Sequence, residues 1–232
     1  MERGWRLILV LLFLIPNISY SASQFTHYFF GKVFAAHALR HNNEAFLYGN
    51  IFPDIRYLGS IPRNSTHFKK LQLSDIKNTS SSFVAGMKLH SFVDEKREQF
   101  AKKHGVYNLI RKYETVYDVT LLKLLEDQYF WNVEMAKSAL NMIDHYPFKK
   151  IDFAKIDEKT FIKWNAWLHI YFSKPLSENI SEYSKIKGKI FIVPNDVMKE
   201  WDGFFSKIVE TKEFKEYCEA LKKHFEDLFS KI

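Results

Sequence analysis

Apolar side chains recur every three or four residues near the end of the chain, and this spacing is the feature that most constrains the fold. The residues that follow it are Phe214, Tyr217, Leu221, Phe225 and Leu228. The spacing places them on one face of an α-helix, while the lysines and glutamates between them face water. The 232 residues include only 8 glycines and 6 prolines, which disfavours an all-β fold with many tight turns. The sequence therefore predicts an all-α fold, a compact single-domain multi-helix bundle.

Charge and cysteine content narrow the classes of function. Lysine and arginine number 34 against 27 aspartates and glutamates, and the formal charge of +7 permits contact with lipid headgroups or nucleic acid without identifying either. A single cysteine, Cys218, excludes an intramolecular disulfide and a zinc site made of cysteines. Any metal must therefore be bound by histidines and carboxylates. The sequence has no glycine-rich phosphate loop and no GxSxG motif, so nucleotide-driven and serine-hydrolase activities have no support.

Residues 1–22 have the layout of a secretory signal peptide. Two arginines precede the apolar run 7–15, and Ser19-Tyr20-Ser21-Ala22 offers small residues for cleavage. The apolar run is shorter than the roughly 20 residues that a membrane-spanning helix needs. We therefore expect an exported protein, secreted or periplasmic, with a mature domain of residues 23–232. An uncleaved N-terminal membrane anchor is the alternative.

Apolar spacing and helix-ending residues divide the rest of the chain into predicted elements. Pro53 disfavours helix at the residue before it, and a serine at 81 or 82 is a favourable first residue for the helix that follows. The predicted elements are helices over 25–42 and 44–51, an irregular connection with short helical turns over 55–82, a helix to Lys103 that stops at Gly105, one or two helices over 107–146, a helix over 158–173, a short strand or extended link over 189–193, and a pair of amphipathic helices from 195 or 196 to the end.

Two polar residues interrupt the apolar face of the helix that begins near Phe83. Phe83, Met87, His90 and Asp94 follow the spacing of one helical face, so the histidine and the aspartate point inward if the other two do. An unpaired buried carboxylate is costly, and a cation, a hydrogen-bond network or a metal is the usual compensation. A histidine and an aspartate one turn apart reach a single metal ion, although a buried hydrogen bond between them explains the pair equally well.

Three residues outside this helix give the pair a context. Asp54 ends the segment Gly49-Asn50-Ile51-Phe52-Pro53-Asp54, His67 follows thirteen residues later, and His27 belongs to Phe25-Thr26-His27. Their order and spacing before Gly86-Met87-Lys88-Leu89-His90-Ser91-Phe92-Val93-Asp94 resemble the zinc-dependent phospholipase C family. The resemblance covers about residues 25–95, and the remainder matches only as generic helix.

The resemblance implies a metal cleft in a helical bundle and a hydrolytic function. Asp54, His67, His90 and Asp94 resemble the four protein ligands of one zinc ion, His27 resembles an additional ligand, and the counterpart of Asp54 also acts as a general base. The implied activity is an exported zinc-dependent phosphoesterase that hydrolyses phosphodiester bonds, with phospholipid as the favoured substrate and peripheral contact with a membrane. Nucleic acid is a less favoured substrate, and the sequence does not give the oligomeric state.

The chain departs from the family pattern in one respect that affects its activity. Downstream of Asp94 there is no second HxxxH or HxxxE motif, so we expect one zinc ion. Glu126 is the best substitute ligand for a second site, and a rim or solvated glutamate is the alternative; His37 and His41 form an HxxxH pair that reads as a surface feature. Two other functions remain open: a secreted metal-binding or membrane-associating protein without turnover, and a nuclease-like enzyme.

Overall fold

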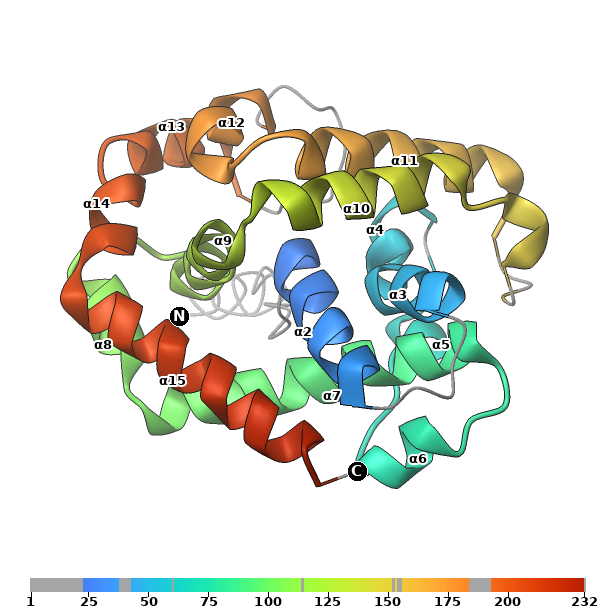
Figure 1. Ribbon diagram of the computed structural model, residues 1–232. Helices are drawn as coiled ribbons and strands as arrows, with labels where there is room; N and C mark the ends of the chain where they lie inside the picture. The colour runs from blue at the N-terminus through green and yellow to red at the C-terminus, as the bar shows by residue number, and fades with distance from the viewer. Residues whose placement is uncertain are drawn as a thin grey trace, which may run out of the picture.

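The computed structural model describes residues 23–37, 43–59, 61–113, 115–151, 153, 156–183 and 193–231. All regular secondary structure in these residues is helical, which confirms the predicted fold class (Figure 1). The elements are α2 (Gln24–His37), α3 (Asn43–Ile51), η1 (Pro53–Ile55), α4 (Arg56–Gly59), α5 (Arg63–Thr66), α6 (Leu73–Lys77), α7 (Ser82–Lys103), α8 (Val106–Arg111), α9 (Asp118–Phe130), α10 (Val133–His145), η2 (Phe148–Lys150), α11 (Glu158–Ser173), α12 (Leu176–Tyr183), α13 (Asn195–Asp202), α14 (Phe205–Glu210) and α15 (Lys212–Phe229).

Side-chain caps explain where several predicted helices begin and where one expectation was wrong. Ser81 accepts a hydrogen bond from the Val84 N–H and starts α7, and Gly105 adopts a positive φ of 65° just after it. The expectation of one or two helices over 107–146 is wrong, because the described residues form three. Asn132 causes the last division, since its side chain accepts bonds from the N–H groups of Glu134 and Met135 and starts α10.

The C-terminal region also contains more helices than the predicted pair. Thr211 divides it, because its backbone is extended and its hydroxyl accepts a bond from the Phe214 N–H at the start of α15. An additional helix, α12, was not predicted at all. The predicted signal peptide and most of the predicted link over 189–193 lie outside the described residues. Across the described helices, none combines the length and apolarity that crossing a membrane takes.

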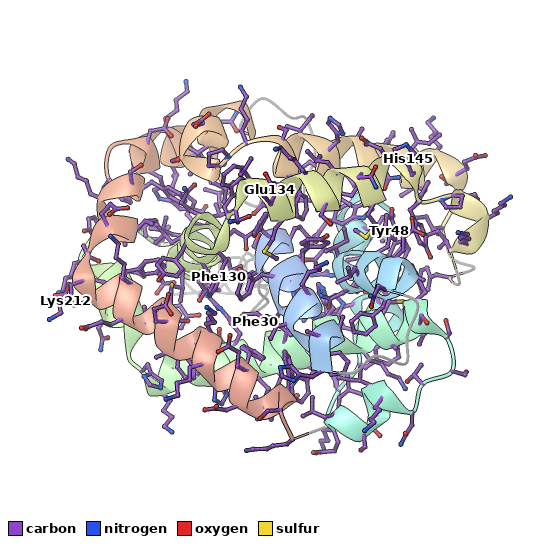
Figure 2. All side chains as sticks on the ribbon, viewed as in Figure 1. Phe30, Tyr48, Phe130, Glu134, His145 and Lys212 are labelled. Carbon is purple, nitrogen blue, oxygen red and sulfur yellow. The ribbon has the colours of Figure 1, made fainter. Side chains whose placement is uncertain are left out.

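Helix α2 lies in the middle of the bundle. It packs against α3, α7, α9 and α15, so side chains around most of its circumference are buried (Figure 1). Figure 2 shows Phe30 of α2 beside Phe130 of α9, with ring centroids 5.5 Å apart, whereas Lys212 projects from the start of α15. Aromatic contacts of this kind fill the core. The first turn of α2 is thereby held deep inside the molecule.

Helices α3 and α7 pack more extensively against each other than any other pair of elements. Two glycines permit this close crossing, since a Cβ at Gly49 would overlap the Phe83 carbonyl oxygen and a Cβ at Gly86 would overlap the Phe46 carbonyl oxygen. Backbone therefore lies against backbone, with no side chain between the two helices at these points. The crossing brings the end of α3 against the middle of α7.

Replacing Gly86 with alanine tests this crossing. The new methyl group would meet backbone that cannot rotate away, so we expect Gly86→Ala to reduce the free energy of unfolding by about 2 kcal/mol or more in urea denaturation. Gly203→Ala is the matched control, because the nearest heavy atom to its added Cβ would be Glu200 O at 3.4 Å. Equal stability of Gly86→Ala and the unsubstituted protein would show that the two helices do not cross in this way.

Candidate metal centre

Three imidazoles and two carboxylates meet inside the bundle, although they come from four separate segments. His27 lies in the first turn of α2, Asp54 in η1 and His67 directly after α5, whereas His90 and Asp94 are one turn apart on α7. All five side chains are buried, and the most exposed of them, His67, is 8% exposed. The structure thus brings together the five residues that the sequence predicts as ligands of the first metal ion.

The distances between nitrogen and oxygen atoms define the arrangement. Oδ2 of Asp94 lies 3.6 Å from Nε2 of both His67 and His90, and Oδ1 of Asp54 lies 3.8 Å from Nε2 of His67. The other oxygen of Asp94, Oδ1, lies 3.1 Å from Nε2 of His27. Asp94 therefore presents one oxygen to His67 and His90 and the other to His27.

These separations suit the ligands of one metal ion. Ligands about 2.0–2.1 Å from a tetrahedral zinc ion lie about 3.4 Å from one another. Among the described residues, two sets of three have ligand atoms within 4.8 Å of one another: His27, His90 and Asp94, and Asp54, His67 and His90. His90 belongs to both sets, so the five residues form one continuous cluster.

Neighbouring groups aim the ligand atoms at the centre of the cluster. Nδ1 of His90 lies 2.9 Å from the carbonyl oxygen of Asn50, which only accepts, so Nδ1 carries the proton and Nε2 keeps its lone pair. Nδ1 of His67 lies 2.8 Å from the Thr66 hydroxyl. Nε2 of Gln24 donates to Oδ2 of Asp54 at 2.9 Å, which leaves Oδ1 toward the histidines. The composition of the cluster was predictable, but these three supporting contacts were not.

Three of the buried ligand atoms lack a hydrogen-bond partner within the described part of the chain. They are Nε2 of His67, Nε2 of His90 and Oδ1 of Asp54. A buried polar atom without a partner costs roughly 1–3 kcal/mol, and here three such atoms from three segments face the same point. A bound cation would satisfy all of them at once, so this donor set fits a divalent metal ion.

Burial and neighbouring charges set the protonation states that metal binding requires. Desolvation lowers the pKa of His90 to about 4 and, with the help of nearby positive groups, also lowers the pKa of His67. Burial alone would raise the pKa of Asp54, but the facing histidines and Arg56 outweigh it, so the pKa is lowered. At neutral pH the two imidazoles are neutral and Asp54 is ionised, which are the forms that bind a cation.

Cationic side chains border the cluster. Nη2 of Arg63 lies 3.5 Å from Oδ2 of Asp94, and Nε of Arg56 lies 3.9 Å from Oδ1 of Asp54. Lys123 of α9 is half-buried; desolvation lowers its pKa to about 8, although Asp54 and Asp94 oppose the change. Two surface hollows lined by described residues, of about 490 and 320 Å³, lie elsewhere, one against α15 and the other lined by residues that include Glu44 and Lys150.

Asp127 of α9 anchors the segment that carries His27. Its carboxylate accepts bonds from the N–H groups of Phe25 and Thr26 at 2.7 and 2.8 Å and from the hydroxyl groups of Thr26 and Tyr171 at 2.6 and 2.7 Å. A carboxylate in this position satisfies backbone donors at the start of a helix and complements the helix dipole. The first turn of α2 is thereby fixed beside the metal cluster from a helix about 100 residues away in the sequence.

Glu126 and His37, two of the residues considered for a second metal site, do not join the cluster. Glu126 points inward as its helical face suggests, but it is fully buried and accepts bonds from Nε of Arg97 at 2.8 Å and from the Tyr217 hydroxyl at 2.6 Å. The alternative of a rim or solvated glutamate is therefore wrong, and the carboxylate is already occupied by Arg97. His37 is exposed at the end of α2, and His41 lies outside the described residues.

No protein-family model matches the chain, and comparisons with curated proteins and with solved structures find no similar protein. The resemblance to zinc-dependent phospholipase C thus stays a prediction. Support for metal binding comes instead from the geometry of the cluster.

The stability of the metal-free protein should depend on pH through His90. Its pKa of about 4 lies below the value of about 6.5 in an unfolded chain, so the unfolded state takes up a proton first as the pH falls. The free energy of unfolding is therefore highest above about pH 6.5 and falls toward pH 4. Protonation of His90 alone lowers it by about 2 kcal/mol at pH 5. Urea denaturation with chelator at pH 7.5, 6 and 5 measures the loss. His90→Asn should reduce the slope of the free energy of unfolding against pH. An unchanged slope would show that His90 does not cause the pH dependence.

Thr66 should control metal affinity without contacting the metal. Thr66→Val keeps the buried shape but removes the hydroxyl beside Nδ1 of His67, and loss of such a contact typically weakens metal binding 10–100-fold. Competition with a chelating dye measures the zinc dissociation constant. Thr79→Val is the control, because the Thr79 hydroxyl bonds the Asp75 carbonyl oxygen at the surface. Equal zinc affinity of Thr66→Val and the unsubstituted protein would show that the Thr66 hydroxyl does not support His67 as a ligand.

Proposed function

We propose that the cluster binds one zinc ion and that the chain is an exported zinc-dependent phosphoesterase that hydrolyses phosphodiester bonds, with phospholipid as the favoured substrate. The observation that carries the proposal is the convergence of Asp54, His67, His90 and Asp94, in which three pairs of ligand atoms lie 3.6–3.8 Å apart. Neutral imidazoles and carboxylates are good ligands for zinc. The predicted resemblance to zinc-dependent phospholipase C supplies the reaction class.

Each residue has a distinct part in the proposal. The ion is held by Oδ1 of Asp54, Oδ2 of Asp94 and the Nε2 atoms of His67 and His90. His27 is an additional ligand of the ion, and its Nε2 lies 3.1 Å from Oδ1 of Asp94. A zinc ion held there supplies Lewis-acid polarisation of a phosphoryl oxygen. Gln24 occupies one lone pair of Oδ2 of Asp54. As general base, Asp54 accepts a proton from the attacking water on the remaining lone pair of that oxygen.

A structural zinc ion without turnover is the second candidate, and the depth of the cluster favours it. His27 and His90 are fully buried, and Asp94 is 3% exposed. Structural zinc sites are closed by protein ligands, whereas catalytic sites keep one position open. This candidate corresponds to the secreted metal-binding protein that the missing second motif also leaves open.

Two substitutions separate catalysis from metal binding. Asp54→Asn should lower turnover roughly 10²–10⁴-fold, because the general base is lost, while much of the zinc remains bound. His90→Ala should lose zinc and activity together. Asp144→Asn is the control, since Asp144 forms an ion pair with His169 at the surface.

The assay uses phospholipid vesicles, single-stranded nucleic acid and a chromogenic phosphodiester, with and without chelator, and zinc content is measured in parallel. Hydrolysis of the vesicles that the chelator abolishes is the expected result. Hydrolysis confined to nucleic acid would favour a nuclease. A fully zinc-loaded protein that hydrolyses none of the three would overturn the enzyme proposal in favour of the structural zinc ion.

A further inference from the structure

The outward surface of α11 combines apolar and basic side chains. Ile162 is 60% exposed and Ile170 is 37% exposed, although both are large apolar residues. Ala166 is also exposed, and the spacing of four residues places the three side chains on one ridge of the helix. Lys159 and Lys163 are exposed on the same side, three or four residues from Ile162 and Ala166. We refer to these five residues as the α11 face.

The opposite side of α11 is fixed to the bundle. Trp164, Leu168 and Phe172 are fully buried, and the helix packs against α10, η1 and α4. Buried and exposed residues therefore alternate with the period of a helix. Since α11 also lies along the outside of the bundle, the α11 face is presented to its surroundings by a well-packed helix (Figure 1).

No carboxylate accompanies the two lysines along the helix. Residues 159–174 include neither aspartate nor glutamate, so neither lysine has an acidic residue three or four positions away in this stretch. The acidic pair 157–158 comes before it, and at the other end Asp144 of α10 forms an ion pair with His169. The charge that the α11 face itself contributes is therefore only positive.

Helix α15 provides a comparison, because its exposed lysines are accompanied by glutamates. Lys212 pairs with Glu216 at 3.7 Å, and Lys215 pairs with Glu210. Charges of both signs are typical of a helix surface that faces water. An exposed apolar ridge beside lysines alone is instead typical of a helix that lies in the interface of a membrane with anionic lipids.

We propose that the α11 face binds the surface of a lipid bilayer that contains anionic lipids. The side chains of Ile162 and Ile170 enter the boundary between headgroups and acyl chains, and the ammonium groups of Lys159 and Lys163 contact the anionic headgroups. This docking goes beyond the proposed hydrolysis of phosphodiester bonds and does not depend on it, because the α11 face contains none of the proposed metal ligands. A lipid hydrolase docked in this way stays at the surface of its substrate.

Co-sedimentation with vesicles tests the docking separately from the chemistry. The vesicles consist of digalactosyl diacylglycerol with or without cholesteryl sulfate, and neither lipid has a phosphodiester bond, so the zinc-loaded protein is studied without turnover. We expect binding to the vesicles with cholesteryl sulfate, weaker binding without it, and a decrease as the salt concentration rises. Lys159→Gln together with Lys163→Gln should lower the partition coefficient roughly tenfold or more. Ile162→Gln should lower it about threefold or more, because apolar contact is lost.

Two matched controls separate this surface from general charge and apolarity. Lys212→Gln together with Lys215→Gln removes the same two charges from α15, and Val133→Gln removes an apolar side chain that is 47% exposed on α10. Both controls should bind vesicles as the unsubstituted protein does. Circular dichroism verifies the fold of every variant, and the substituted side chains are all on the surface.

The outcomes distinguish the docking from the enzyme proposal. A zinc-loaded protein that binds no vesicles with cholesteryl sulfate would overturn the docking, as would equal losses in the lysine variants of α11 and α15. Binding to single-stranded nucleic acid in place of vesicles, lost when the two α11 lysines are replaced, would also overturn it. Vesicle binding that the α11 variants weaken, by a protein without any hydrolytic activity, would support the docking and overturn only the enzyme proposal.

Discussion

The close crossing of α3 and α7 is the constraint on which the candidate site depends. With glycines at the crossing, the Asn50 carbonyl oxygen comes within 2.9 Å of Nδ1 of His90. The Asn50 side chain also donates to the carbonyl oxygen of His27, so the same residue joins α2 to the crossing. The direction of His90 and the depth of His27 are thus both set by backbone packing. The part of the site that His27, His90 and Asp94 form is a consequence of how α2, α3 and α7 meet.

Two buried polar clusters in this bundle differ in a way that indicates their roles. In one, Glu126 receives bonds from Arg97 and Tyr217, and Glu98 receives bonds from Arg97 and Tyr107. Lys102 also pairs with Glu98 at 3.2 Å, so two cations face the two carboxylates. Such a network fixes one arrangement of α7, α9 and α15. In the other, the Nε2 atoms of His67 and His90 face carboxylates at 3.6–3.8 Å, beyond hydrogen-bond distance. Direct donors hold both carboxylates of the first cluster, whereas the second fits an ion at its centre.

Local patterns predicted much of the fold and of the site, and contacts distant in sequence account for what they missed. The spacing of His90 and Asp94 on an apolar face was sufficient to place both side chains inside. Nothing near Glu126 in the sequence revealed that Arg97 would meet it, because the two belong to different helices. Asp127 and Arg63 were overlooked for the same reason. The additional helices arise from single caps such as Asn132 and Thr211, whose effect depends on local backbone geometry.

Anomalous diffraction at the zinc edge from crystals of the purified protein is the sharpest test of whether this cluster is a metal centre. We expect one strong peak, within about 2.0–2.2 Å of Nε2 of His67, Nε2 of His90 and the facing oxygens of Asp54 and Asp94. A protein purified with zinc in the buffer whose crystals show no peak among these residues, or whose only zinc lies elsewhere, would contradict a metal centre at this position.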